Sequence, residues 1–341
     1  MILVAGAGVF GASIALVLAQ AGAEVTLADP AAPTMAGVWD NASGVAAGML
    51  APAFEAVLDP PSAGHFDLLR QARERWPAFA ERLGGRDIGL SQAGAVWAEA
   101  ADDDPSERAR IEAALSRLGA VVSRREGLLF TPEDWRLDAP IALAALRDAG
   151  REAGVRFAAG AVEAFNPGRA TLSSGEVVGA ETMVLAIGAS EAVLPTELTL
   201  LTPICGQILH FASAGHGRNL PTIRFAGGYR VDGDSGVLVG ATMEPGRRPA
   251  PAAAAALKAK ALSHFPELAD AAATVRSGVR ASTPDGLPMV GPSSRPGVFL
   301  AVGARRNGWL LAPLVAEMTA AYLAGGDFGA DAAPFDPRRF G

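Results

Sequence analysis

Apolar runs separated by glycine-rich turns predict parallel strands at both ends of the chain and antiparallel strands in its middle. Near the amino end, the apolar run 2–5 suits a buried strand, and residues 12–21 are good helix formers without proline. Near the carboxyl end, VFLAVG at 298–303 has the pattern of a buried strand, and 309–325 that of a helix ended by glycine. Residues 201–243 instead alternate in the manner of antiparallel strands. We therefore predict an α/β fold in which a discontinuous domain carries an inserted antiparallel sheet.

The segments between these units also have predictable structure. A helix over 65–83 contains Pro77, which marks a break or a new start. Segment 101–125 has the pattern of a solvated amphipathic helix. Further predictions are helices over 138–151 and 251–264, strands over 155–162 and 183–189, a hairpin through 170–178 and, within 201–243, the strands GQILHF, PTIRF, YRVDG and VLVGATM.

Three glycines at the first turn give the amino-terminal unit the fingerprint of a dinucleotide-binding fold. Gly6 permits a tight turn, Gly8 lets backbone N–H groups approach a pyrophosphate, and Gly11 lets helix and strand pack closely. The diphosphate would lie at the positive end of the helix. Asp29, 23 residues after Gly6, falls where a carboxylate can accept hydrogen bonds from a ribose. The alternative is a glycine turn with a structural role only.

Composition narrows the function classes that this fold can serve. The length of 341 residues allows two domains. The single cysteine, Cys205, excludes an internal disulfide and a cysteine-cluster metal site, and the four histidines form no ligand-spaced pair, so a redox reaction needs an organic cofactor. The net charge of −7 without a basic patch argues against a nucleic acid partner.

The first 22 residues are almost wholly apolar, which could indicate a signal peptide or a membrane anchor. No Lys or Arg precedes Arg70, however, so the positive charge that begins a signal peptide is missing. We therefore expect no signal peptide, no integral membrane segment and a soluble, cytoplasmic protein.

Four further motifs identify a family resemblance. NASGVAAGMLAP at 41–52 offers small residues that could line a ligand closely or pack as a small-residue helix. GVRASTPDGLPMVGP at 278–292, GARRNGWLLAP at 303–313 and the hairpin YRVDGDSGVLVGATMEPG at 229–246 complete the set. Together they closely resemble the D-amino-acid-oxidase-like FAD-dependent flavoproteins, and the glycine oxidases of thiamine biosynthesis in particular. The resemblance implies a Rossmann-like FAD-binding domain made of 1–83, 136–200 and 275–341, and an α+β substrate domain made of 84–135 and 201–274.

The resemblance implies non-covalent binding of FAD by separate parts of the chain. Gly278 stands where sarcosine oxidases carry a flavin-linking cysteine. The residues implied in FAD binding are Gly6, Gly8, Val9, Phe10, Gly11, Asp29, Ala42, Ser43, Ala47, Gly48, Met49, the backbone at Val162, Gly188, Ala304, Arg305, Arg306, Asn307, Gly308, Trp309 and Leu310.

Four residues are implied in substrate binding. Arg306 would hold the substrate carboxylate with Arg280 nearby, and Tyr229 would form a hydrogen bond from the inserted sheet. Met243 would line the pocket. Two adjacent arginines on a glycine-flanked loop need an anion to offset their repulsion, which favours this role for Arg306. The alternatives are a structural ion pair for either arginine, a half-buried sheet tyrosine and a core methionine.

The chain departs from the family's glycine oxidases at two places. Ala304–Arg305 stands where they usually carry His-Phe. Arg230–Val231–Asp232 stands where an apolar residue and a Pro-Arg pair usually follow the tyrosine. Flavin phosphate, a second substrate carboxylate and solvent are the open partners for Arg305. These departures leave open whether glycine itself is the substrate.

The activity implied is FAD-dependent oxidative deamination of glycine, sarcosine or a small D-amino acid. A hydride leaves Cα for flavin N5, because no protein side chain can accept it, and the resulting imine gives an oxoacid. The amine must be neutral, so activity should rise toward alkaline pH. Oxygen, which yields hydrogen peroxide, is one electron acceptor; with another acceptor the enzyme is a D-amino-acid or secondary-amine dehydrogenase. Two alternative functions remain: a nicotinamide-dependent dehydrogenase, and a flavin-binding subunit of a larger assembly that has no activity of its own. The oligomeric state also stays open, although family members often form homo-oligomers.

Overall fold

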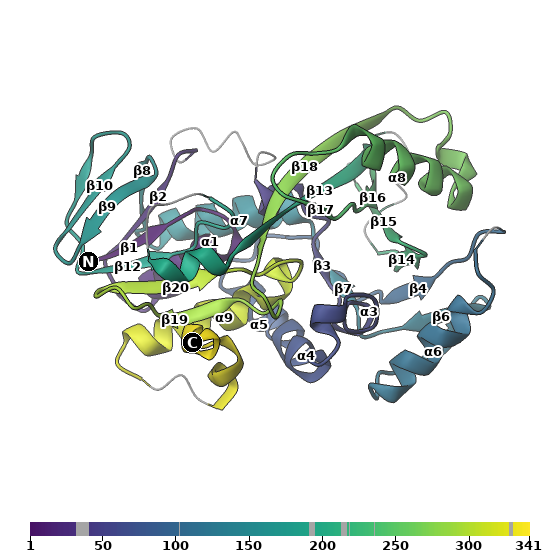
Figure 1. Ribbon diagram of the computed structural model, residues 1–341, viewed down its shortest axis with the longest axis horizontal. Coiled ribbons are helices and arrows are strands. Elements are labelled where there is room, and N and C mark those ends of the chain that lie inside the picture. Colours follow the sequence, from purple (N-terminus) through teal and green to yellow (C-terminus); the bar gives the residue numbers. More distant parts are fainter. Residues whose placement is uncertain are drawn as a thin grey trace.

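The computed structural model describes residues 1–31, 41–101, 103–190, 195–212, 217, 219–234, 236–326 and 330–341. Ser235, within the hairpin motif 229–246, lies outside the described residues. The molecule is elongated, with one sheet toward each end, and both chain termini lie on the side of the first sheet (Figure 1). Among the described residues, no helix combines the length and the hydropathy that a membrane span requires.

The first sheet is formed by the apolar runs that the sequence predicts as parallel strands. In the described part of the chain its order is β19, β20, β12, β1, β2, β8. Neighbouring strands are parallel except β19 and β20, which are antiparallel. The strand bounds are β1 Ile2–Ala5, β2 Val25–Asp29, β8 Arg156–Ala159, β12 Thr182–Leu185, β19 Met289–Pro292 and β20 Val298–Val302.

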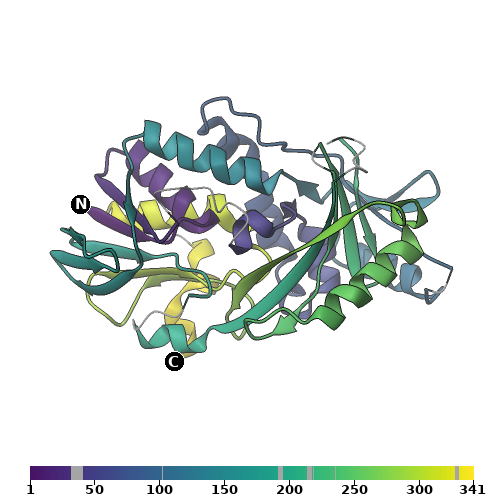
Figure 2. The same ribbon diagram turned by 90° about the horizontal axis from the view of Figure 1, so that it is seen from above.

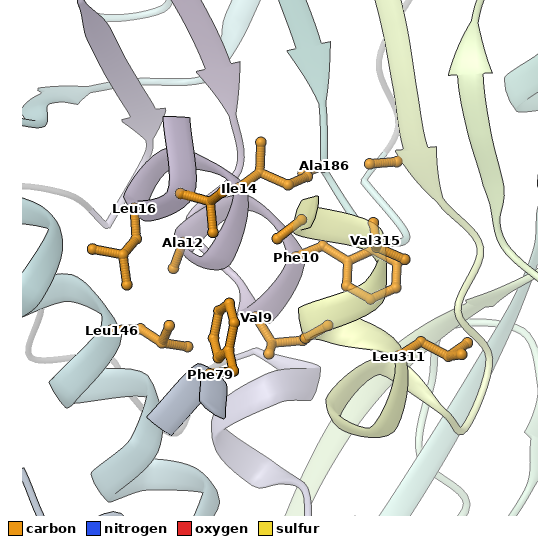
Figure 3. Packing of buried hydrophobic residues seen from close by; sticks show 14 of the residues in the cluster. Val9, Phe10, Ala12, Ile14, Leu16, Phe79, Leu146, Ala186, Leu311 and Val315 are labelled. Carbon is orange, nitrogen blue, oxygen red and sulfur yellow. The ribbon is translucent and has the colours of Figure 1, made fainter. Parts of the chain in front are cut away.

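Helix α1, Val9–Gln20, is apolar on every side and is therefore buried among the helices that pack beside the first sheet. Its residues Val9 to Leu18 are all buried. Figure 3 shows Phe79 of α5 (Trp76–Glu81), Leu146 of α7 (Ala139–Glu152) and two residues of α9 (Gly308–Leu323) packed around it. The amino end of α1 is therefore fixed beside the ends of the first-sheet strands.

The second sheet has two long strands, β13 and β18, toward one end of its strand order. They pair in antiparallel fashion over ten residues each, from Thr202 opposite Ser282 to Phe211 opposite Ala273. Figure 2 shows α8 (Pro251–His264) running alongside these two strands, where its Leu257 and Ala261 enter an apolar cluster. The bounds are β4 Ala95–Trp97, β5 Ser123–Arg125, β6 Leu128–Thr131, β13 Thr202–Phe211, β14 Thr222–Phe225, β15 Gly228–Gly233, β16 Gly236–Gly240, β17 Glu244–Pro245 and β18 Ala273–Ser282.

Short elements fill the space between and around the two sheets. Strand β3 pairs with β7, and β9, β10 and β11 form a small antiparallel sheet. The remaining bounds are α2 Ala42–Val45, β3 Met49–Leu50, α3 Pro52–Leu58, η1 Pro60–Ser62, α4 Phe66–Glu74, α6 Glu107–Arg117, β7 Trp135–Arg136, β9 Val162–Asn166, β10 Arg169–Leu172, β11 Val177–Val178, η2 Thr196–Leu200, η3 Pro266–Leu268, η4 Ala330–Phe335 and η5 Pro337–Phe340.

The predicted α/β fold is confirmed, and the differences occur where glycine changes the chain direction. The break predicted at Pro77 within 65–83 is confirmed, since this proline stands in the first turn of α5, which follows α4 as a separate helix. Helix α6 is shorter than the predicted 101–125, since Gly119, with a φ of 74°, follows its carboxyl end and residues 123–125 form β5. The predicted strand 155–162 breaks at Gly160, with a φ of 121°, and β9 begins at Val162.

The domain boundaries remain a prediction. Residues 275–282, which the prediction places with the FAD-binding domain, belong to β18 and pair with β13 in the second sheet. Strands β4 and β6, which were not predicted as strands, also join that sheet through β14.

Candidate active site

The predicted cofactor residues of the first sheet lie together where its parallel strands end, along the side of the sheet formed by their carboxyl ends. Strand β1 leads into Gly6, β2 ends at Asp29, β12 is followed by Gly188, and Val162 comes three residues after β8. These strands are parallel neighbours in the order β12, β1, β2, β8, so their carboxyl ends share one edge. Ligands of open α/β sheets bind at this edge.

Two glycines allow the backbone at this edge to pack more closely than a side chain would permit. Gly6 has a φ of 100°, and a Cβ atom there would lie 2.5 Å from the carbonyl oxygen of Ala186. A Cβ atom on Gly11 would lie 1.8 Å from the carbonyl oxygen of Gly6. Gly8 caps α1 without a side chain of its own. The turn therefore forms a backbone cradle at a helix amino terminus, which fits the diphosphate of a dinucleotide such as FAD.

Hydrogen bonds join three predicted cofactor segments at this cradle. The Val9 N–H donates to Ser43 Oγ at 3.0 Å, and Trp309 Nε1 donates to the Ser43 carbonyl oxygen at 3.0 Å. Ser43 thus links α2 to the amino ends of both α1 and α9. The three segments, far apart in sequence, are adjacent at the site.

Asp29 organises the backbone around the same turn. Its Oδ2 accepts a hydrogen bond from the Ala7 N–H at 2.8 Å, and its Oδ1 accepts one from the Ala31 N–H at 2.9 Å. A carboxylate has about four acceptor positions, so two remain for the predicted ribose. The ribose contact stays a prediction.

Several other predicted cofactor residues have their side chains packed in the core or bonded within the protein. The side chain of Phe10 packs in the core (Figure 3), and Leu310 is also fully buried in that apolar cluster. Asn307 Nδ2 donates to Ser62 Oγ at 3.2 Å. Ala304 pairs with Ser282, and Gly308 begins α9.

A pocket lies between α2, β3 and α9 on one side and the second sheet on the other. It brings together all four predicted substrate-binding residues, Tyr229, Met243, Arg280 and Arg306, which come from different elements. The rest of its lining is Ala42, Val45, Ala46, Ala47, Gly48, Met49, Glu55, Gly206, Ile208, Ala241, Gly278, Asn307 and Trp309.

Arg306 already has a protein carboxylate as its partner. Its Nη2 donates to Glu55 Oε1 at 2.9 Å, and its Nε lies 2.7 Å from Oε2. Arg224 Nη2 donates to the same Oε1 at 3.0 Å, and the Glu55 and Arg224 side chains are both nearly fully buried. Glu55 thus supplies an anion that offsets the charge of Arg306, and the predicted contact between Arg306 and a substrate carboxylate stays a prediction.

Arg305 also has a protein partner, which was not among the partners left open for it. Its Nη2 donates to Asp59 Oδ1 at 2.6 Å, and Asp59 Oδ2 accepts a hydrogen bond from Ser62. Arg305 has a φ of 47°, an uncommon conformation for a residue with a side chain. The ion pair holds the loop in this shape and directs the Arg305 side chain toward α3 and η1.

Arg280 is the pocket cation that lacks such a partner. Within the described part of the chain, its guanidinium contacts only the Thr242 carbonyl oxygen at 3.4 Å and Met243 Sδ at 3.6 Å. Gly206 leaves room for it, since a Cβ atom there would lie 1.8 Å from Arg280 Nη1. Burial lowers the pKa of Arg280, but a guanidinium remains protonated at neutral pH. Arg280 is thus a partly buried cation in the pocket lining, and no carboxylate among the described residues forms an ion pair with it.

The ionisation of Glu55 follows from its two arginines. Burial alone would raise its pKa, but the guanidiniums of Arg306 and Arg224 outweigh burial and lower the pKa to about 2. Glu55 is therefore ionised at neutral pH. It acts as an anion in the pocket wall, and it is a poor proton acceptor.

Replacing Glu55 by glutamine should lower the free energy of unfolding at neutral pH by about 3 kcal/mol, because the buried guanidinium of Arg224 and the partly buried one of Arg306 lose their anion. The contribution of Glu55 should be fully present above pH 4.5, its usual pKa, and disappear as the pH falls toward 2. Urea unfolding of both proteins between pH 2 and 7 measures this difference. The control is Glu99→Gln, which breaks a more exposed pair with Arg108 and should cost less than about 1 kcal/mol. Equal losses in the two variants would contradict the assignment.

The sequence prediction missed Glu55, Asp59 and Arg224. The signal available was the presence of two carboxylates, Glu55 and Asp59, in an otherwise apolar segment, PAFEAVLD. Their pairing with adjacent arginines near the carboxyl end follows only from the fold. Among the described residues, no group of three His, Cys, Asp or Glu side chains could hold a metal ion.

Comparison with known proteins adds the following similarities. Residues 1–322 match the family model described as FAD dependent oxidoreductase. A glycine oxidase of Geobacillus kaustophilus (strain HTA426) is 31% identical over 98% of this chain and 96% of its own. The crystal structure of glycine oxidase from Geobacillus kaustophilus has a TM-score of 0.83 at 28% identity and covers 98% of this chain and 97% of that one. The structure of iminodiacetate oxidase from Chelativorans sp. BNC1 shares the fold, with a TM-score of 0.83 at 24% identity over 99% of each chain.

Proposed function

Because the chain belongs to the family of FAD-dependent oxidoreductases, we propose that it oxidises the Cα–N bond of a small amino acid whose carboxylate binds Arg280. Glycine, sarcosine and small D-amino acids are the candidate substrates. The observation that carries the proposal is a partly buried arginine that lines the pocket without a carboxylate partner among the described residues, beside a buried tyrosine. Similarity to a glycine oxidase supports the substrate class.

The residues present fit FAD as the cofactor. The backbone cradle at Gly6, Gly8 and Gly11 would hold the diphosphate, Asp29 the ribose, and the segment around Met49 the flavin end, because that segment lines the pocket. When bound, FAD supplies an acceptor for the two electrons and the hydrogen that leave Cα as a hydride.

Arg280 and Tyr229 would position the substrate. A guanidinium binds a carboxylate through two parallel hydrogen bonds, which fixes both its place and its plane. Burial raises the pKa of Tyr229, so its hydroxyl stays protonated and can donate to the same carboxylate. In this assignment the carboxylate role passes from Arg306 to Arg280.

The reaction converts the amine to an imine, and water then hydrolyses the imine to an oxoacid and ammonia or a primary amine. With oxygen as acceptor, the two electrons and two protons yield hydrogen peroxide. No histidine lines the pocket among the described residues, so the chain supplies no evident base for the substrate amine. The neutral amine is the reactive form.

Adding glycine, sarcosine or D-alanine to the FAD-loaded protein without oxygen should bleach the flavin absorbance with at least one of them. A control reaction with acetate, which has a carboxylate but no amine, should perturb the flavin spectrum without bleaching it. Hydrogen peroxide formation in air distinguishes an oxidase from a dehydrogenase that uses another acceptor. If no amine in the panel bleaches the flavin, the proposed substrate class is wrong.

A further inference from the structure

The charges around the pocket form one connected group. Glu55 lies on α3, Arg224 on β14, and Arg306 on the loop before α9. Arg224 does not line the pocket, but its guanidinium bonds two side chains that do: Glu55 Oε1 at 3.0 Å and Met49 Sδ at 3.2 Å. One carboxylate therefore balances two guanidiniums, one of which faces the pocket.

A carboxylate in a pocket wall would ordinarily stabilise a bound ammonium ion. Such an ion is unreactive here, since hydride leaves Cα only when the amine nitrogen has a free electron pair. With Arg224 and Arg306 both bound to it, Glu55 has no charge left to serve as counter-ion for the substrate. The two arginines thus make the wall around the amine unfavourable for a cation.

Other titratable groups near the pocket do not reverse this balance. Asp134 accepts hydrogen bonds from the Ala53 and Phe54 N–H groups beneath α3, and burial raises its pKa to about 7, so it is only partly ionised at neutral pH. Burial raises the pKa values of Tyr229 and Cys205, which keeps both neutral.

Two more carboxylates near the pocket are engaged elsewhere. Asp59 pairs with Arg305 at 2.6 Å. On β17, Glu244 accepts hydrogen bonds from Gln207 Nε2 at 2.8 Å and the Ala250 N–H at 2.6 Å. Neither lines the pocket, so neither is placed to serve as counter-ion for a bound ammonium.

We propose that Arg224, acting through Glu55, favours the uncharged form of the substrate amine in the pocket, so that the amine releases its proton to water on binding and needs no side-chain base. This inference rests on the proposed function. It makes Arg224 a positioning residue that touches neither substrate nor flavin. It also gives Glu55 and Arg224 opposite effects on the same titration.

The test is the pH dependence of the rate constant for flavin reduction, measured with FAD-loaded protein, without oxygen and at saturating sarcosine or whichever amine of the panel reacts. Under saturation this profile reports the bound amine. Arg224→Met should shift its midpoint upward by about one pH unit, because Glu55 regains charge that can stabilise the ammonium. Glu55→Gln should shift it downward, and Arg224→Lys, which keeps the charge, should restore the wild-type midpoint.

Two controls isolate the amine. Glycolate carries a carboxylate but no amine, and its binding can be measured from the change that it causes in the oxidised flavin spectrum. The pH dependence of its dissociation constant should be the same in all variants. Arg108→Met removes the same charge from a partly exposed pair and should leave the midpoint unchanged.

Equal midpoints in wild type, Arg224→Met and Glu55→Gln, or shifts of the two variants in the same direction, would overturn the inference while leaving the proposed function intact. Flavin that no amine reduces at any pH would overturn both. If Arg224→Met does not fold, the sign of the Glu55→Gln shift decides the question.

Discussion

Replacing Arg280 by methionine should lower the second-order rate constant for flavin reduction by about 100-fold or more while FAD stays bound. Two hydrogen bonds between a guanidinium and a carboxylate each contribute about 1.5–3 kcal/mol, and methionine retains neither of them. Methionine keeps much of the length of the side chain, so the space beside Gly206 stays filled. Rapid mixing with the reactive amine in the absence of oxygen measures the rate constant, and the flavin absorbance of the purified protein measures cofactor content.

Arg276→Met is the matched control, because Arg276 lies on the same strand, β18, but does not line the pocket. It should change the rate constant by less than about threefold, since Arg276 is partly exposed and water and salt screen its charge. A variant Arg280→Met that reduces its flavin at the wild-type rate would remove Arg280 from the carboxylate site.

Gly11→Ala should abolish stable FAD binding. The new methyl group would lie 1.8 Å from the carbonyl oxygen of Gly6, so α1 must move away from the turn that forms the diphosphate cradle. That oxygen belongs to backbone already packed against Ala186, so the strain has no flexible side chain to absorb it. The ratio of flavin to protein absorbance after purification measures the loss.

The matched control is Gly64→Ala, the same substitution at a glycine where a Cβ atom would meet nothing within 4 Å. It should keep the full complement of flavin. Wild-type flavin content in Gly11→Ala would mean that the amino-terminal turn does not form the cofactor cradle as described.

The amino-terminal unit could be predicted closely because its signals are local. The apolar runs, the glycine spacing and the absence of proline all lie within 29 residues, and the helix predicted over 12–21 is observed at Val9–Gln20. Strands β4 and β6 could not be found in this way. Each is three or four residues long and is held by pairing with distant segments, as β4 is by β14. Such pairing leaves little trace in the short strand itself.

In the site, too, residues within one motif could be predicted from the sequence, whereas contacts between distant segments could not. The arginines of the GARRNG loop could be identified from one motif, but their carboxylates could not. Arg306 and Glu55 are 251 positions apart, and Arg305 and Asp59 are 246 apart. The sequence suggested a substrate anion for Arg306, because only the fold shows that Glu55 of α3 lies beside it. Once Glu55 and Asp59 are assigned, Arg280 is the pocket arginine left for the substrate carboxylate.

The most direct test of this account is a crystal structure of the FAD-loaded protein with glycolate bound. We predict that the glycolate carboxylate lies within hydrogen-bonding distance of the Arg280 guanidinium and the Tyr229 hydroxyl, and that the ion pair between Arg306 and Glu55 stays intact. A carboxylate bound to Arg306 with Glu55 displaced, or bound away from Arg280, would contradict it.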